Sequence, residues 1–206
     1  DVLQGLATTA ATWTIDATTD YQDAVSTNLM NFSQFDDLRG STAADTFQIG
    51  ATPPQVSITG GDGADQLVAN SAGSDFTVSL IDRGSVDTDG SVSTFNGIGT
   101  LIGNAGNDSF TFVNSGSLSG LVNGAGGNDT IIGDNNGNIF NVTSPNAGTL
   151  AGKLTGGFQN VENLNGGDVD DVFDIDAALS GNIVAGGGAD LVDIADTVSI
   201  SGSIIT

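Results

Sequence analysis

Short stretches in which apolar and polar residues alternate follow one another along the chain, separated by glycine-rich segments. Residues 45–49 (DTFQI), 108–112 (DSFTF) and 171–175 (DVFDI) place apolar side chains at every second position. This alternation is typical of β-strands that bury one face. Windows with apolar residues at helical spacing are interrupted by glycine or β-branched residues. The sequence therefore predicts an all-β fold.

The chain also repeats itself with a period of 63 residues. The pattern F-x-x-[FIV]-x-x-L-x-G begins at Phe32, Phe95 and Phe158. The three strand stretches named above keep the same phase, and so do Trp13, Phe76 and Ile139 upstream. We expect a cap or linker at 1–12, repeats at 13–75, 76–138 and 139–201, and the start of a further coil at 202–206. All of these are predicted to form one continuous domain.

A shorter spacing recurs inside each repeat, where an aspartate precedes each of two strand stretches about 20 residues apart. The pairs are Asp45 and Asp65, Asp108 and Asp129, and Asp171 and Asp190. We interpret each repeat as three coils of about 21 residues, the third of which, for example 76–94, lacks the glycine–aspartate signature. Short strands, glycine corners and this spacing predict a right-handed parallel β-helix, or β-solenoid. A sandwich of antiparallel hairpins is the structural alternative.

A β-solenoid stacks its inward side chains into apolar columns. The side chains expected in these columns are Phe47, Ile49, Leu67, Phe110, Phe112, Ile131, Phe173, Ile175 and Val192. The phenylalanines that begin the 63-residue pattern, Phe32, Phe95 and Phe158, are expected to pack at corners rather than to bind a ligand.

The charge of the chain narrows the range of partners. It has 25 Asp and Glu residues against three Lys and Arg, a net charge of −22. Such a surface repels nucleic acid and anionic membranes and attracts cations, so we expect no nucleic-acid partner. No apolar stretch of 18 residues is present, so no membrane span is predicted.

Candidate catalytic chemistry is sparse. The chain has no histidine or cysteine, and its serines lack a partnering base. A polysaccharide hydrolase would need two carboxylates facing one cleft. The close pairs available are Asp36 with Asp37, Asp87 with Asp89, and Asp170 with Asp171. We predict that the chain is not an enzyme, with a polysaccharide-active β-helix as the alternative. Few aromatic residues are available for a lectin-like face, because Trp13 and Tyr21 are the only Trp and Tyr.

Residues 60–68, GGDGADQLV, fit the nonapeptide G-G-x-G-x-D-x-U-x, in which U is a large apolar residue. This segment resembles the calcium-binding repeats of RTX proteins. The resemblance implies Ca²⁺ between successive coils, bound by backbone carbonyls of Gly60, Gly61 and Gly63 and by aspartate carboxylates. The implied carboxylates form three stacked pairs: Asp45 with Asp65, Asp108 with Asp129, and Asp171 with Asp190.

This sequence departs from the RTX pattern in two ways. Its motif comes once per coil instead of every nine residues, and Ser41, Asn104 and Ala125 replace glycines. In the alternative interpretation each aspartate accepts hydrogen bonds from backbone N–H groups of its turn, without metal. Stacked carboxylates repel one another, and Asn107 and Asn128 would relieve that repulsion. Both interpretations remain open at this point.

Residues 158–173, FQNVENLNGGDVDDVF, are similar to repeats of large bacterial surface and secreted adhesins, which resemble filamentous haemagglutinin. This resemblance implies an extracellular or cell-surface location and a structural or adhesive role as part of a stalk, biofilm matrix or filament, stabilised by calcium if the RTX-like turns bind it. The implied partners are cations and other protein segments, or copies of the chain itself, at the solenoid ends. A self-assembling fibre subunit with head-to-tail stacking is an alternative role.

Overall fold

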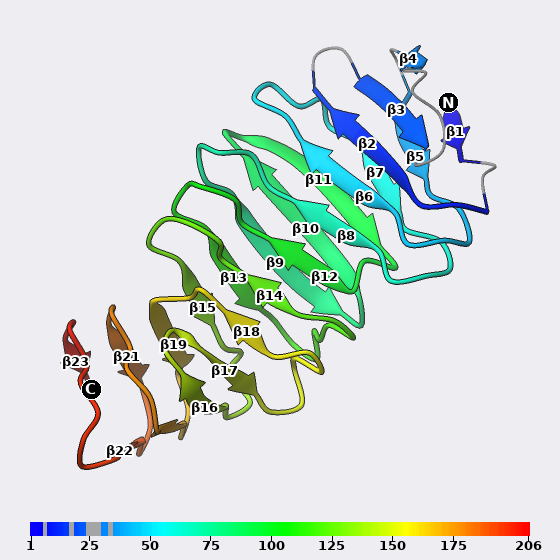
Figure 1. Ribbon diagram of the computed structural model, residues 1–206. Coiled ribbons are helices and arrows are strands. Elements are labelled where there is room, and N and C mark those ends of the chain that lie inside the picture. The colour runs from blue at the N-terminus through cyan, green and yellow to red at the C-terminus, as the bar shows by residue number, and fades with distance from the viewer. Residues whose placement is uncertain (6–7, 17–18, 24–29, 33–34) are drawn as a thin grey trace.

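A computed structural model describes residues 1–5, 8–16, 19–23, 30–32 and 35–206, with only the backbone course given for 19–23 and 30–32. The described residues form strands and turns without a helix, which confirms the all-β prediction. The strands lie side by side in a long stack, with β1 to β4 near one end and β22 and β23 at the other (Figure 1).

The described strands belong to two large, mostly parallel sheets. In spatial order, the 11-stranded sheet, called sheet A, contains β1 (Val2–Gln4), β5 (Asp37–Arg39), β7 (Ser57–Thr59), β11 (Ser91–Asn96), β10 (Arg83–Thr88), β9 (Asp75–Leu80), β13 (Ser109–Phe112), β15 (Thr130–Ile132), β19 (Asn163–Gly167), β21 (Ile183–Gly186) and β23 (Ile204–Ile205). The 12-stranded sheet, called sheet B, contains β22 (Leu191–Ile194), β20 (Val172–Ile175), β16 (Ile139–Ser144), β17 (Ala147–Leu150), β18 (Phe158–Gln159), β14 (Val122–Asn123), β12 (Thr100–Ile102), β8 (Gln66–Val68), β6 (Thr46–Ile49), β2 (Ala11–Ile15), β3 (Thr19–Asp23) and β4 (Met30–Phe32).

The chain crosses between the two sheets after each single strand. From β5 to β8, from β12 to β15 and from β19 to β22, successive strands alternate strictly between sheet A and sheet B. Each single strand pairs in parallel with the strand that the chain forms after it has crossed to the other sheet and back, a path called here one crossing cycle. Thr46 pairs with Gln66, 20 residues further on, whereas Ala11 approaches Asp45 across a separation of 34 residues. The number of residues along the chain between paired parallel strands is therefore not uniform.

Three antiparallel ribbons interrupt this alternation: β2–β3–β4, β9–β10–β11 and β16–β17–β18. They occupy the part of each repeat that was expected to form a third coil, so the division into three coils of 21 residues is wrong. In the second ribbon, Asp89 (φ 52°) and Gly90 (φ 83°) both have positive φ. Two such residues form the tight turn that reverses a β-hairpin.

The ribbons also determine how the repeats are placed. In the described residues, each repeat contributes one ribbon and four single strands. These five segments lie alternately in sheet A and sheet B. Because five is odd, successive repeats begin in opposite sheets: β2–β4 and β16–β18 lie in sheet B, and β9–β11 lie in sheet A. Equivalent residues of neighbouring repeats therefore lie in different sheets, and the arrangement recurs only after two repeats.

The core lies along the buried faces of the strands and contains almost all of the side chains expected in it. Phe47, Ile49, Leu67, Phe110, Phe112, Ile131, Phe173 and Ile175 are all buried, and Val192 is partly buried against them. Aromatic rings stack between the first strand of each ribbon and its parallel neighbour, in the pairs Trp13–Phe47, Phe76–Phe110 and Phe140–Phe173.

The expected corner positions of the pattern-starting phenylalanines are not observed. Phe95 and Phe158 are buried within strands β11 and β18, and the side chain of Phe32 lies outside the described residues. Alternation of apolar and polar residues around both positions makes them ordinary inward strand positions.

Candidate functional site

The aspartates of the three expected pairs, together called the aspartate ladder, lie directly before strands at equivalent places of neighbouring turns. Asp45, Asp65, Asp108, Asp129 and Asp171 are at most 2% exposed, and Asp190 is half-buried. Burial of an ionised carboxylate is costly unless hydrogen bonds or counter-charges compensate it. The hydrogen bonds of these side chains therefore decide what the ladder does.

One oxygen of each carboxylate joins two neighbouring turns. In every case the backbone N–H of the residue at the equivalent place of the preceding strand donates to Oδ1. The donor–acceptor pairs are Ala11 to Asp45 (2.8 Å), Asp45 to Asp65 (2.7 Å), Ser74 to Asp108 (2.7 Å), Asp108 to Asp129 (2.8 Å), Asn138 to Asp171 (2.7 Å) and Asp171 to Asp190 (3.0 Å). Glu162 extends the series, because its Oε2 accepts the N–H of Asp129 at 2.9 Å.

The three expected pairs are thus adjacent, but a backbone N–H joins each pair. This hydrogen bond needs no metal, but its donor belongs to the neighbouring turn, whereas the metal-free interpretation expected donors in the aspartate's own turn. Among the described residues, no group of three or more acidic side chains is placed to hold a metal ion. Calcium binding by the aspartates and by Gly60, Gly61 and Gly63 stays a prediction of the resemblance.

The second carboxylate oxygen explains the glycine that stands five residues before each buried aspartate. Oδ2 of Asp65 lies 2.5 Å from the position that a Cβ would take on Gly60. The same close approach relates Gly103 to Asp108, Gly124 to Asp129, and Gly166 to Asp171. A side chain at these positions would overlap the carboxylate. The G-x-x-x-x-D spacing is therefore a packing requirement of the turn.

Gly61 and Gly63 are required for another reason. Their φ angles are +105° and +120°, which favour glycine. A Cβ on Gly61 would also meet the carbonyl of Ser41, and one on Gly63 would meet the backbone of Ala43 at 2.7 Å. The glycine-rich match to the nonapeptide is thus accounted for by the close stacking of two turns.

Four of the buried carboxylates have an oxygen without a hydrogen-bond partner, namely Oδ2 of Asp65, Asp108, Asp129 and Asp171. Asp45 differs, because its Oδ2 accepts the backbone N–H of Ser41 at 2.6 Å and the Ser41 hydroxyl at 3.1 Å. The buried aspartates therefore form two chemical classes. Among the aspartates of the ladder, only Asp45 has donors at both oxygens within the described residues.

The lack of donors, together with burial, favours protonation. Burial raises the pKa of Asp108 to about 7 with the help of the neighbouring charges of Asp129 and Asp75, although the N–H of Ser74 opposes the shift. Burial likewise raises the pKa of Asp65 and of Asp129 to about 6.

The carboxylates next to these groups act in the same direction. Asp45 and Asp62 repel the charge of Asp65, and Glu162 repels that of Asp129. Burial also raises the pKa of Asp171, against hydrogen bonds from Asn138. The ladder thus contains carboxyl groups that bind protons near neutral pH.

The acid pairs considered for a hydrolase are engaged in local contacts. Asp37 binds Arg39 at 2.7 Å, and Oδ1 of Asp87 accepts the N–H of Gly90 at 2.9 Å. Oδ1 of Asp170 accepts the N–H of Ala189, and Asp171 is buried in the ladder. At least one carboxylate of each pair is thus engaged in a local contact.

The three basic side chains have different surroundings. Lys153 is 13% exposed and forms an ion pair with Asp134, which is 1% exposed. Arg39 is bound to Asp37 on the same strand. Arg83 is exposed and makes neither a hydrogen bond nor an ion pair through its side chain within the described residues.

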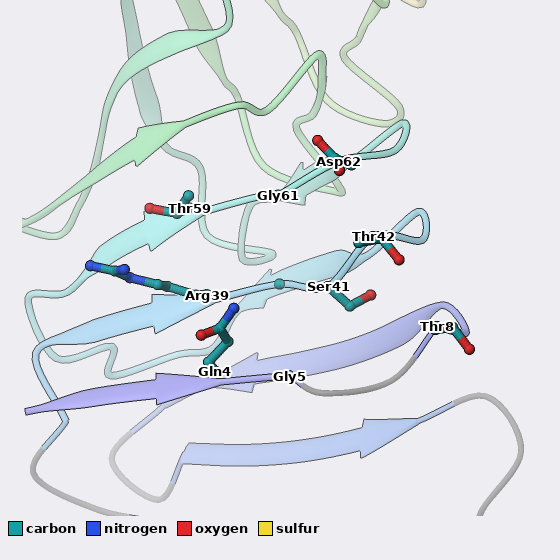
Figure 2. A pocket seen from close by; sticks show the side chains of 10 residues that line it. Gln4, Gly5, Thr8, Arg39, Ser41, Thr42, Thr59, Gly61 and Asp62 are labelled. Carbon is teal, nitrogen blue, oxygen red and sulfur yellow. The ribbon is translucent and has the colours of Figure 1, made fainter.

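The outer face of sheet A carries two polar hollows. One has a volume of about 500 Å³, and Figure 2 shows Gln4, Arg39 and Thr59 along its neighbouring strands β1, β5 and β7. The other, about 480 Å³, lies over β7, β9, β10 and β11 and contains Arg83. The sequence patterns did not predict either hollow, although the alternation of apolar and polar residues in 83–96 indicates which side chains point outward.

Comparison with known proteins identifies no relative. No family model, curated protein or solved structure matches the chain. In the described residues, no helix is long and apolar enough to cross a membrane.

Proposed function

We propose that the chain is a right-handed parallel β-solenoid that serves as a structural or adhesive segment of an extracellular bacterial surface protein. Its role is that of a stalk, matrix or filament segment. The observation that carries this proposal is the order of the strands. Single strands alternate between two sheets, and each pairs in parallel with the strand one crossing cycle away. Winding a chain in coils produces this order.

The contacts between neighbouring strands support a mechanical role. Neighbouring parallel strands are joined by backbone hydrogen bonds and stacked apolar side chains, and several of these pairs also by a buried aspartate. Stability is then a sum of terms between neighbouring strands along the stack. A force along the stack must break complete strand pairs, whereas a surface loop carries little of it.

Single-molecule extension tests this role. The chain would be tethered by both ends in series with a helical marker domain, which provides an internal reference for low unfolding force. We expect the chain to remain folded until after the marker unfolds. Extension of the chain before the marker would contradict a load-bearing role. Antibody labelling of intact cells of the source would test the surface location separately.

A fibre subunit is the second candidate, supported by the last strands of the two sheets. Leu191, on β22, is 56% exposed, and Ile204 and Ile205, on β23, are 42% and 53% exposed. Exposed apolar side chains on strands at a sheet edge favour addition of a further β-segment, whether it belongs to the same chain or to another copy. Sedimentation velocity at rising protein concentration tests this role, with added salt to screen the net charge of −22. A mass that stays monomeric under these conditions would contradict it.

A further inference from the structure

The hollow over β10, β11 and β7 differs in charge from the rest of the molecule. It has a volume of about 480 Å³, and its polar lining includes Ser57, Thr59, Arg83, Ser85, Thr94 and Asn96. None of its lining residues is acidic, although the chain carries 25 Asp and Glu residues. Arg83 is the one charged residue among the described residues that line it.

Strand register arranges the polar side chains in two rows. Arg83 pairs with Asn96, and Asn96 pairs with Thr59. In the second row, Ser85 pairs with Thr94, which pairs with Ser57. Neighbouring strands are about 4.8 Å apart, so each row presents a polar group at that interval.

Both rows point away from the core, because they alternate with buried side chains. Between the rows lie Gly84, Phe95 and Ile58, which pair with one another across the three strands, and Phe95 and Ile58 are at most 1% exposed. Rows of hydroxyl and amide groups can both donate and accept hydrogen bonds. That capacity matches the hydroxyl groups of a sugar, which also donate and accept.

Arg83 supplies the one charged contact. Its guanidinium presents a planar fork that binds a carboxylate through two parallel hydrogen bonds. One positive charge balances one negative charge. A polyphosphate would carry several charges into the field of a protein with a net charge of −22. Phe95, the aromatic residue below the hollow, is 1% exposed and offers no stacking surface, so a neutral sugar would lack a strong anchor.

We propose that this hollow binds a carboxylate-bearing sugar, such as a uronic acid unit of a polysaccharide. Arg83 binds the carboxylate, and the two rows bind the sugar hydroxyls. The proposal rests on the adhesive form of the proposed function and specifies its ligand. Because the hollow is open to solvent, affinity for a single unit is weak, with a Kd of about 1 mM.

The test uses the full chain and a galacturonic acid trimer, with the methyl-esterified trimer as the neutral probe. Binding is measured by NMR titration or calorimetry. We expect the acidic trimer to bind at least tenfold more tightly than its ester. Arg83→Ala should reduce its affinity at least tenfold, and Arg83→Lys should fall between Arg83→Ala and the natural chain.

Arg39→Ala is the matched control, because Arg39 lies in the same row beyond Thr59 but is already bound to Asp37. It should leave the affinity unchanged. Equal binding of the ester, or equal loss in the two alanine variants, would overturn the proposal. Absence of binding to the natural chain would also overturn it, while a chain that still resists extension would leave the mechanical role intact.

Discussion

Asn138 and Asp171 stand at equivalent places of neighbouring turns, and the Asn138 amide donates a hydrogen bond to Oδ1 of Asp171 at 2.9 Å. The same Nδ2 donates to the carbonyl of Gly166 in the next turn at 2.8 Å. In the aspartate turns the unpartnered Oδ2 and an equivalent carbonyl both lie beside one glycine: a Cβ on Gly103 would meet Oδ2 of Asp108 and the carbonyl of Gly124, and one on Gly166 would meet Oδ2 of Asp171 and the carbonyl of Ala185. Asn138 thus carries a donor where the aspartates carry an acceptor.

This comparison predicts the effect of replacing an unpartnered aspartate by asparagine. We expect Asp108→Asn to raise the free energy of unfolding at pH 8 by about 1–3 kcal/mol, because an amide can donate where a carboxylate cannot. Chemical denaturation at pH 8 measures this change.

Asp45→Asn is the control for that substitution. Both oxygens of Asp45 accept hydrogen bonds, from Ala11 and from Ser41. Its replacement should lower the free energy of unfolding by about 1–2 kcal/mol. Destabilisation of similar size in both variants would show that Asp108 is also ionised and satisfied.

The raised pKa values predict that the protein gains stability on mild acidification. In the unfolded chain these carboxyl groups titrate near 3.8, whereas folding raises the pKa of Asp65 and Asp129 to about 6 and that of Asp108 to about 7. Between about pH 4 and pH 7 the folded state therefore binds more protons than the unfolded state. Stability falls as pH rises through this window.

Thermal melts between pH 5 and pH 8 measure this dependence. We expect the highest Tm near pH 5, and the slope should flatten when Asp65, Asp108 and Asp129 are all replaced by asparagine. A Tm that rises from pH 5 to pH 8 would contradict proton binding by the ladder.

The glycine spacing can be tested within one turn. A Cβ on Gly124 would collide with the carboxylate of Asp129 and with the carbonyl of Asn160, whereas one on Gly126 would meet its nearest atom at 3.7 Å. We expect Gly124→Ala to cost about 3 kcal/mol or more and Gly126→Ala to change stability by less than about 0.5 kcal/mol. Similar costs at both positions, measured by urea denaturation, would show that the close approach of Asp129 is not what requires glycine.

The Lys153–Asp134 pair should matter more than the Arg39–Asp37 pair. Burial raises the pKa of Asp134, but hydrogen bonds from Lys153 and Asn136 and the charge of Lys153 outweigh it and lower that pKa. Lys153→Met would leave a buried charge without compensation and should cost about 3–5 kcal/mol at pH 7.

Arg39→Met is the matched control, because the Arg39 side chain is 48% exposed, and such pairs contribute about 1 kcal/mol or less. Denaturation at pH 7 compares the two. Equal effects would mean that burial does not determine the strength of these pairs.

The sequence contained enough information for the strands but not for their connections. Alternation around Phe47, Phe110 and Phe173 placed these residues correctly in the core, because one buried face is a local property of a strand. The ribbons were missed because a parallel coil and an antiparallel hairpin share the same alternation. The turn at Asp89 and Gly90 was the local signal that could have separated them.

The candidate sites likewise have features that the sequence predicted and features that depend on how the turns and strands are placed. The aspartate ladder was visible as a spacing, but the asymmetry between Oδ1 and Oδ2 depends on which turn lies beside each aspartate. Asn138 and Glu162 belong to the ladder without being aspartate, so the motif alone could not find them. Arg83 falls on no repeated position, and only the register with Asn96 and Thr59 places it in a polar row.

Whether hydrogen bonds and protons alone satisfy the aspartate ladder is tested most directly by thermal melts of the natural chain at pH 8, in excess chelator and in millimolar calcium. We predict the same Tm in both conditions and no bound calcium at equilibrium. A Tm that rises by many degrees with calcium, with one or more ions bound per 63-residue repeat, would contradict this prediction. The unpartnered carboxylate oxygens would then be metal ligands, as the RTX-like turns imply.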